Sequence, residues 1–114
     1  MVKHLLLDQL KIKKATQNEW KEILNLLDES KMTFWLLGNE GYENFFIVKN
    51  STANDIICCF AIDIENEAGI LRSFTIRKNL QGKGLGSYIV NNLIPEISKE
   101  LKIKTLFSFL KKRS

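Results

Sequence analysis

The sequence contains few of the residues that build disulfide frameworks and zinc sites. Among its 114 residues are two cysteines, adjacent at Cys58 and Cys59, and one histidine, His4. Neighbouring cysteines are poorly placed for a structural disulfide, and one histidine cannot supply a zinc site. We therefore expect neither kind of domain, and we expect both cysteines to be buried structural residues.

Long hydrophobic runs are absent as well. The N-terminal stretch MVKHLLLDQLKIKK has only three consecutive leucines before Asp8, which is too short for a signal peptide or a membrane span. Hydrophobic residues make up 45% of the chain and charged residues 26%, as in ordinary globular proteins. We expect a single domain, residues 1–114, located in the cytoplasm and not in a membrane.

Acidic residues are outnumbered by basic ones. The chain has 17 Lys and Arg against 13 Asp and Glu, a net charge of +4, which would suit an anionic ligand. The basic residues are scattered, apart from KIKK at Lys11–Lys14 and the tail KKRS at Lys111–Ser114. Both clusters are typical of solvated surface, so we do not expect nucleic-acid binding.

The first half of the chain begins as a strand and a capped helix. Alternating apolar and charged residues predict a strand at Leu10–Ala15, and Thr16 with Glu19 forms a capping box that opens a helix. Four apolar residues continue this helix: Trp20, Ile23, Leu24 and Leu27. Residues 31–42, KMTFWLLGNEGY, are ambiguous, and we expect a short second helix that leads into a loop.

The second half changes to strand periodicity. Strands are predicted at Asn44–Lys49, Ile56–Ile64 and Gly69–Ile76, and their short polar turns make them an antiparallel meander. A helix at Leu85–Leu101 and a strand at Ile103–Leu110 follow. Because strand–helix–strand crossovers are right-handed, the last two strands should lie parallel. We expect an α/β (α+β) fold with a mixed sheet.

The predicted last helix contains the only proline of the chain, Pro95. Its apolar stripe has i, i+4 spacing and consists of Ile89, Leu93, Ile97 and Leu101. Proline lacks an N–H and its ring clashes with the preceding turn. We therefore expect either a bend near Leu93 or a second helical segment with Pro95 in its first turn.

Three glycines, Gly82, Gly84 and Gly86, lie between the third meander strand and this helix. A strand that leads through glycines into a helix can bind phosphate through unpaired backbone N–H groups, and Arg77, Lys78 and Lys83 add positive charge. Neither the dinucleotide-binding spacing nor the P-loop spacing is present. A tight turn without a ligand stays open as the alternative.

The stretch LRSFTIRKNLQGKGLGSYIV, residues 71–90, resembles motif A of the GNAT superfamily of N-acetyltransferases, whose pattern is Gln/Arg-x-x-Gly-x-Gly/Ala. Gln81, Gly84 and Gly86 occupy its three defining positions. The expected order of elements, β-α-α-β-β-β-α-β, also matches over residues 10–110. The resemblance implies a GNAT-like fold that lacks the usual final helix and last two strands.

The resemblance also implies acetyl-CoA as the cofactor, wedged between splayed fourth and fifth strands. The backbone of Phe74, Thr75 and Ile76 would run beside the pantetheine, and Gln81 would shape the turn. Six backbone amides would surround the pyrophosphate, those of Gly82, Lys83, Gly84, Leu85, Gly86 and Ser87. The implied reaction is direct acetyl transfer to an amine of a small molecule or a peptide.

The catalytic residues of that reaction are not identified by the sequence. Ile70 stands where the family often has a glutamate, and Glu65 and Glu67 are expected to solvate a hairpin turn. Of the two tyrosines, Tyr88 falls on the predicted helix, in the wrong region to protonate a thiolate, and Tyr42 is expected to pack in the core or at its rim. Phe34 and Trp35 are candidates either for substrate contact or for the core. A non-catalytic CoA-binding or protein-binding module is therefore the alternative function.

The last predicted strand, Ile103–Leu110, would leave an apolar edge without a covering element. Such an edge favours pairing with another chain. We therefore expect a homodimer or a larger homo-oligomer.

Overall fold

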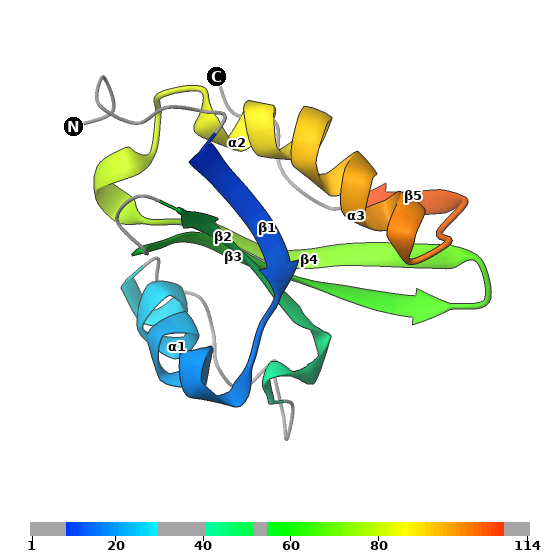
Figure 1. The fold of residues 1–114 in the computed structure, drawn as a ribbon, viewed down its shortest axis with the longest axis horizontal. Coiled ribbons are helices and arrows are strands. Elements are labelled where there is room, and N and C mark those ends of the chain that lie inside the picture. Colours follow the sequence, from blue (N-terminus) through cyan, green and yellow to red (C-terminus); the bar gives the residue numbers. More distant parts are fainter. Residues whose placement is uncertain (1–8, 30–40, 52–54, 109–114) are drawn as a thin grey trace.

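The sheet has five strands in one mixed arrangement. The computed structural model describes residues 9–29, 41–51 and 55–108, and its strands pair in the order β1-β2-β3-β4-β5 (Figure 1). The strands are β1 Leu10–Lys14, β2 Phe45–Asn50, β3 Asp55–Glu65, β4 Ala68–Ile76 and β5 Thr105–Ser108. The first four are antiparallel and β5 runs parallel to β4, which confirms the predicted meander and parallel crossover.

Helices cover both faces of the sheet, with α1 on one face and α2 and α3 on the other (Figure 1). These elements are α1 Trp20–Glu29, α2 Leu85–Tyr88 and α3 Ile94–Glu100, with the π-helical segment Ile89–Leu93 between the last two. Short 3₁₀ turns lie at Gln17–Glu19, Tyr42–Asn44 and Lys78–Leu80. No helix in the described ranges is long and apolar enough to cross a membrane.

Two predicted elements differ from the structure or fall outside it. The last strand was predicted at Ile103–Leu110 but begins at Thr105, because Ile103 and Lys104 complete the turn that follows α3. Residues 109 and 110 lie outside the described residues. Most of the predicted second helix, residues 31–42, also lies outside them.

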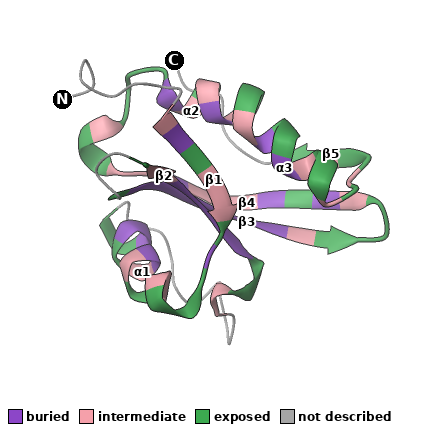
Figure 2. Ribbon diagram, viewed as in Figure 1, coloured by how far each residue is buried: buried purple, intermediate pink, exposed green. Residues whose placement is uncertain are grey.

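The hydrophobic core has two halves, one on each side of the sheet (Figure 2). On the side of α2 and α3, Phe60 stacks between Phe46 and Phe74, with ring centroids 5.6 and 6.0 Å apart. On the side of α1, the Trp20 ring lies 5.3 Å from that of Phe45. The sheet is thus buried over much of both faces, and its middle strand β3 is buried without interruption from Ile56 to Ile62.

Cys58 and Cys59 point into opposite halves of this core. Both thiols are free and fully buried. Burial raises the pKa of Cys59 to about 12 despite the lowering effect of the Arg77 charge, and burial raises the pKa of Cys58 well above its ordinary value. The thiolates needed for nucleophilic chemistry are therefore not accessible at neutral pH, and the prediction of buried structural cysteines is confirmed.

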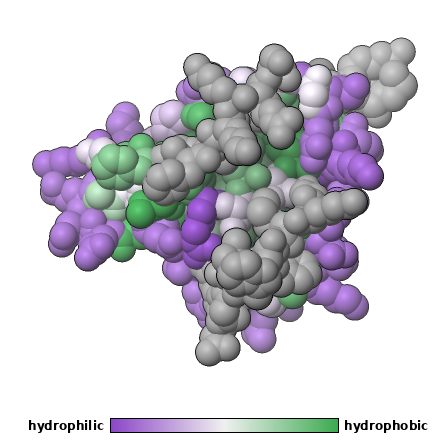
Figure 3. Space-filling model, turned by 180° about the vertical axis from the view of Figure 1, so that it is seen from behind, coloured by the Kyte–Doolittle hydropathy of each residue, from purple (hydrophilic) through white to green (hydrophobic). Residues whose placement is uncertain are grey.

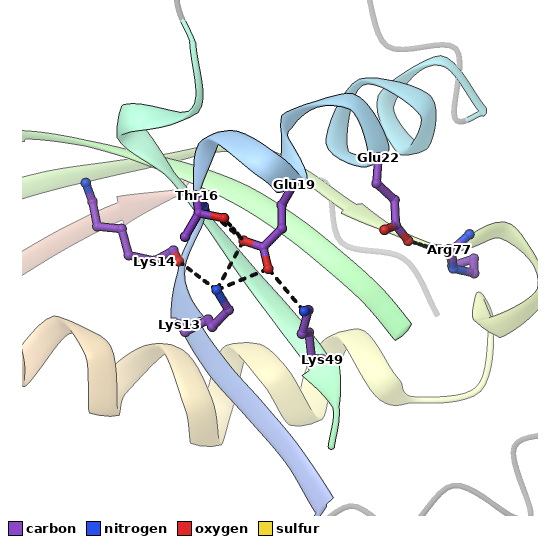
Figure 4. A network of polar contacts seen from close by, with 7 residues as sticks. All are labelled: Lys13, Lys14, Thr16, Glu19, Glu22, Lys49 and Arg77. Carbon is purple, nitrogen blue, oxygen red and sulfur yellow. Dashed lines mark hydrogen bonds and ion pairs between the residues drawn. The ribbon is translucent and has the colours of Figure 1, made fainter. Parts of the chain in front are cut away.

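The capping box predicted at the start of α1 is present (Figure 4). Glu19 Oε1 accepts the backbone N–H of Thr16 at 2.9 Å. The same carboxylate bridges Lys13 and Lys49, with each Nζ 3.1 Å from Oε2. The helix buries Ile23, Leu26 and Leu27. Of the four apolar residues noted in the sequence, Ile23 and Leu27 are thus in the core, and Leu24 is half-buried.

A second helical segment, α3, begins at Ile94 and has Pro95 in its first turn, which is one of the two predicted alternatives. The Ile94 N–H donates to the Ile89 carbonyl, five residues back, which closes a π-helical turn. Pro95 then falls in the first turn of α3, where a missing N–H costs little. The π-helical turn contains one residue more than an α-helical turn, so it shifts the apolar stripe of the helix. Ile89, Ile94 and Ile97 are buried, and Leu93, a member of the predicted stripe, is only partly buried.

Candidate functional site

The glycine turn, residues 77–84, follows β4 directly and leads to Leu85, the first residue of α2 (Figure 1). Gly82 and Gly84 both have left-handed backbones, with φ of 75° and 79°. A Cβ built on either residue would have no neighbouring atom within 4 Å. These two glycines therefore satisfy a backbone requirement and face open space.

Gly86 has a different reason for being glycine. A Cβ at this position would lie 3.1 Å from Ile76 Cδ1 and 3.8 Å from Phe74 Cε1. The residue therefore lets α2 approach the end of β4 closely. Helix–strand packing is thus a reason for glycine at position 86 that is independent of any phosphate group.

Gln81 folds back onto the strand. Its side-chain Nε2 donates to the Ile76 carbonyl at 2.8 Å, so the side chain closes the turn that the glycines continue. Lys83 and Ser87 are exposed, and Leu85 is buried against the core. The turn thus presents exposed backbone at Gly82 to Gly84 and is anchored by Leu85 and Gln81.

The positive charges expected around the turn are not all available to a ligand. Arg77 directs its guanidinium to the Ile56 carbonyl, at 2.9 Å from Nε, and to Glu22 Oε2, at 2.7 Å from Nη2 (Figure 4). The charge of Arg77, which was grouped with Lys78 and Lys83, is therefore paired with Glu22. Lys78 and Lys83 are exposed.

A bulge interrupts β4 next to the predicted cofactor residues. The pairing of β3 with β4 shifts between Cys59 opposite Thr75 and Ala61 opposite Arg72, and Ser73 has a φ of 57°. The Thr75 hydroxyl donates to the Ser73 carbonyl at 3.2 Å. Bulges of this kind bend a strand and redirect its polar groups. Ser73 was not among the predicted residues, because serine carries no signal for a left-handed backbone.

The predicted backbone stretch of Phe74, Thr75 and Ile76 lies beyond this bulge. Among the residues that the structure describes, pairing with β5 extends from Ala68 to Leu71, opposite Thr105 to Ser108. Within the described part of the chain, β5 does not continue beside Phe74, Thr75 or Ile76. The described geometry thus brings together the end of β4 and the glycine turn.

Acidic groups near β4 are engaged in ion pairs or turns. Asp63 accepts Arg72 Nε at 2.6 Å and Arg72 Nη2 at 3.0 Å, and Ile70 lies opposite Asp63 in the sheet. Glu65 and Glu67 are exposed at the hairpin between β3 and β4, as predicted. The geometry thus identifies no separate general base on β4.

The remaining aromatic candidates divide in two. Tyr88 packs against the core half of α2 and α3. Tyr42 packs against that of α1, as predicted. Phe34 and Trp35 lie outside the described residues. The described tyrosines therefore serve packing.

Comparison by sequence and by structure gives different results. No protein-family model matches the sequence, and no curated protein matches it. Solved structures do match. Protein Rv2747 of Mycobacterium tuberculosis, solved in complex with CoA, has a TM-score of 0.65 and 17% identity, over 86% of this chain and 63% of that one.

Two further structures extend this likeness. A GNAT-family acetyltransferase from Brucella melitensis, in complex with acetyl-CoA, has a TM-score of 0.63 and 10% identity over 90% of this chain and 77% of that one. N-acetylglutamate synthase from Neisseria gonorrhoeae, complexed with CoA and N-acetyl-glutamate, has a TM-score of 0.63 and 19% identity. The match covers 87% of this chain and 24% of that one. The chain spans less than two thirds of the Mycobacterium and Neisseria proteins. Its fold is that of the GNAT acetyltransferases.

Proposed function

We propose that this protein binds acetyl-CoA and transfers its acetyl group to an amine of a small molecule or a peptide. The observation that carries the proposal is the glycine turn at the end of β4, where Gly82 and Gly84 have left-handed backbones and open space around them. Exposed backbone at the start of a helix is suited to an anionic group. The turn has room for phosphate where a side chain would obstruct it.

The cofactor would be held mainly by backbone. We assign the pyrophosphate to the amides of Gly82, Lys83, Gly84, Leu85, Gly86 and Ser87. The backbone of Phe74, Thr75 and Ile76, beyond the last described pairing with β5, would bind the pantetheine. The side chain of Gln81 would keep the turn closed through its bond to the Ile76 carbonyl. When bound, acetyl-CoA would supply the activated acetyl group as a thioester.

The similar structures support this assignment. The Mycobacterium and Neisseria proteins were solved with CoA, and the Brucella protein with acetyl-CoA. Their shared fold is the reason for proposing the same cofactor here. We further propose that the chain is a member of the GNAT superfamily, since Gln81, Gly84 and Gly86 match motif A and lie on the corresponding strand–turn–helix.

Calorimetry with CoA tests the cofactor site. Gly84→Val should abolish binding, because it adds a branched side chain where the backbone is left-handed and faces the ligand. Asn66→Val is the matched control, since Asn66 also has a positive φ, of 59°, but lies in the hairpin between β3 and β4. It should leave CoA affinity unchanged. Equal CoA affinity in the wild type and Gly84→Val would refute the proposal.

A non-catalytic CoA-binding module is the second candidate. It is favoured by the engagement of Asp63 with Arg72 and by the packing of Tyr42 and Tyr88, which leave no described base and acid at the cofactor stretch. A missing acid or base typically costs about 10²–10⁴-fold in rate. Detection of free CoA thiol with a panel of amines separates the two candidates: slow turnover supports the transferase, and none supports the binding module.

A further inference from the structure

Two carboxylates of α1 reach the start of the glycine turn. Glu22 and Glu29 are about two helical turns apart and so lie on one face of the helix. Glu22 Oε2 accepts Arg77 Nη2 at 2.7 Å, and Glu29 Oε1 accepts the backbone N–H of Lys78 at 3.1 Å. Arg77 and Lys78 are the first two residues after β4. One helix therefore holds the entry to the turn at two consecutive residues.

Arg77 joins three elements at this point. Its guanidinium also donates to the Ile56 carbonyl, at 2.9 Å from Nε and 2.6 Å from Nη2, and its backbone N–H donates to the Ile57 carbonyl at 2.8 Å. Its side chain is 30% exposed. The residue thus links α1, the beginning of β3 and the end of β4, and its planar group is used for structure.

Glu29 completes a helix end that lacks its own cap. Arg77 is the N-cap residue of the 3₁₀ turn Lys78–Leu80 and makes no side-chain capping bond. The Glu29 carboxylate, from α1, accepts the first N–H of that turn instead. The Gln81 side chain then ties the turn's far end to the Ile76 carbonyl. Residues 77–81 are therefore fixed at both ends before the glycines begin.

We propose that Glu22, Arg77 and Glu29 are positioning residues for the glycine turn. They hold residues 77–81 so that the backbone from Gly82 to Ser87 is presented in one arrangement, and the ligand in this proposal is the CoA of the proposed function. A preorganised site binds more tightly because less order is lost on binding. The two acidic side chains thus strengthen the binding of an anion that their charge alone would repel.

A purely electrostatic role and a positioning role of Glu22 and Glu29 predict opposite changes in CoA affinity. If Glu22 and Glu29 acted only through charge, their neutral amides would bind the polyanionic CoA more tightly. If they position the turn, Glu22→Gln and Glu29→Gln should weaken CoA binding by about 3–10-fold each, as expected for a partly exposed charged hydrogen bond. Arg77→Lys, which keeps the charge but loses the fork, should weaken it similarly.

The experiment combines two measurements on the full chain. Hydrogen exchange without ligand should be faster at residues 78–87 in the three variants, by about 3–10-fold, and unchanged in β2 and β3, which shows that the sheet is intact. Calorimetry then measures CoA affinity. Asp28→Asn is the matched control, because Asp28 is an exposed acid on the same helix. It should change neither measurement.

Each outcome decides the proposal. Faster exchange together with weaker CoA binding supports it. Unchanged exchange at residues 78–87 overturns the positioning role whether or not CoA binds. Faster exchange with unchanged or tighter CoA binding overturns the link to the cofactor. A wild-type chain that does not bind CoA overturns the proposed function and this link together, and it is recognised because it is seen without any substitution.

Discussion

Glu19 and Thr16 form a closed pair at the start of α1, in which Glu19 Oε1 accepts both the backbone N–H of Thr16, at 2.9 Å, and its hydroxyl, at 3.0 Å. Burial alone would raise the pKa of Glu19. The hydrogen bonds from Thr16, Lys49 and Lys13 outweigh it and lower the pKa from 4.5 to about 2. The folded state thus favours the ionised carboxylate at this helix end.

The first prediction follows from that pKa. Because the folded pKa lies below the unfolded one, Glu19 stabilises the fold fully above pH 4.5 and loses this contribution as the pH falls towards 2. Glu19→Gln should lower the free energy of unfolding by about 1–3 kcal/mol at pH 7. Chemical denaturation from pH 7 to pH 2 should show the gap to wild type closing. A gap that stays constant across this range would contradict the prediction.

The second prediction concerns Lys102, which lies in the turn directly after α3 and has a left-handed backbone, with a φ of 61°. Its N–H donates to the Lys99 carbonyl at 3.1 Å, and the Ile103 N–H donates to the Ser98 carbonyl at 2.9 Å, a capping pattern that favours glycine. Lys102→Gly should stabilise the protein by about 1 kcal/mol. Thermal unfolding measures the change. Lys102→Ala is the control and should give no such gain, since alanine keeps the strained Cβ.

The third prediction separates the glycines of the turn. Gly86→Val should destabilise by about 1–3 kcal/mol through overpacking, because its Cβ would lie 3.1 Å from Ile76 Cδ1. Gly82→Ala meets no atom within 4 Å and should cost only the left-handed backbone, about 1 kcal/mol. Adding Ile76→Val, which removes Cδ1, should restore part of the loss in Gly86→Val. Strictly additive losses in denaturation experiments would argue against the packing role.

The fourth prediction is a homo-oligomer, which we propose from the exposed apolar residues at the β5 edge of the sheet. Ile70 and Phe107 are neighbours across β4 and β5, and their exposed fractions are 38% and 52%. Seen from behind in Figure 3, hydrophobic side chains gather at the left end of the molecule among hydrophilic ones. β5 is the last strand of the described sheet, so a second copy could pair there.

Light scattering at micromolar concentration tests this assembly. Phe107→Lys should raise the dissociation constant by about 10-fold or more, as expected for a central apolar contact. Lys83→Ala, at the exposed glycine turn, is the control and should leave the oligomeric state unchanged. A wild-type chain that is strictly monomeric at these concentrations would be incompatible with the proposal.

The fold was predictable where the sequence carries a local pattern. The alternation in β1 and the capping box at Thr16 and Glu19 both depend on residues close in sequence. The parallel pairing of β4 and β5 followed from the general handedness of crossovers. These features need no knowledge of distant contacts.

The features that were missed depend on neighbours far along the chain. Arg77 was grouped with the charges of the turn, but its partners are Glu22 and the Ile56 carbonyl, which only the folded sheet and helix bring near. Gly86 was interpreted from motif A alone, but the space that Ile76 and Phe74 leave is a second requirement for glycine at this position. Ser73 adopts its left-handed backbone because the strand pairing shifts around it. No motif within a few residues encodes these contacts.

The π-helical turn before Pro95 behaves as a one-residue insertion in the helix. A π turn contains more residues than the α turn that it replaces, and the Asn92 side-chain amide donates to the Tyr88 carbonyl within this turn, at 3.0 Å. A relative with an unbroken α-helix would therefore be one residue shorter between Ile89 and Ile94. An ungapped alignment of the two would pair Leu93 with the buried position that Ile94 fills, so every core residue of α3 would be compared with the wrong partner.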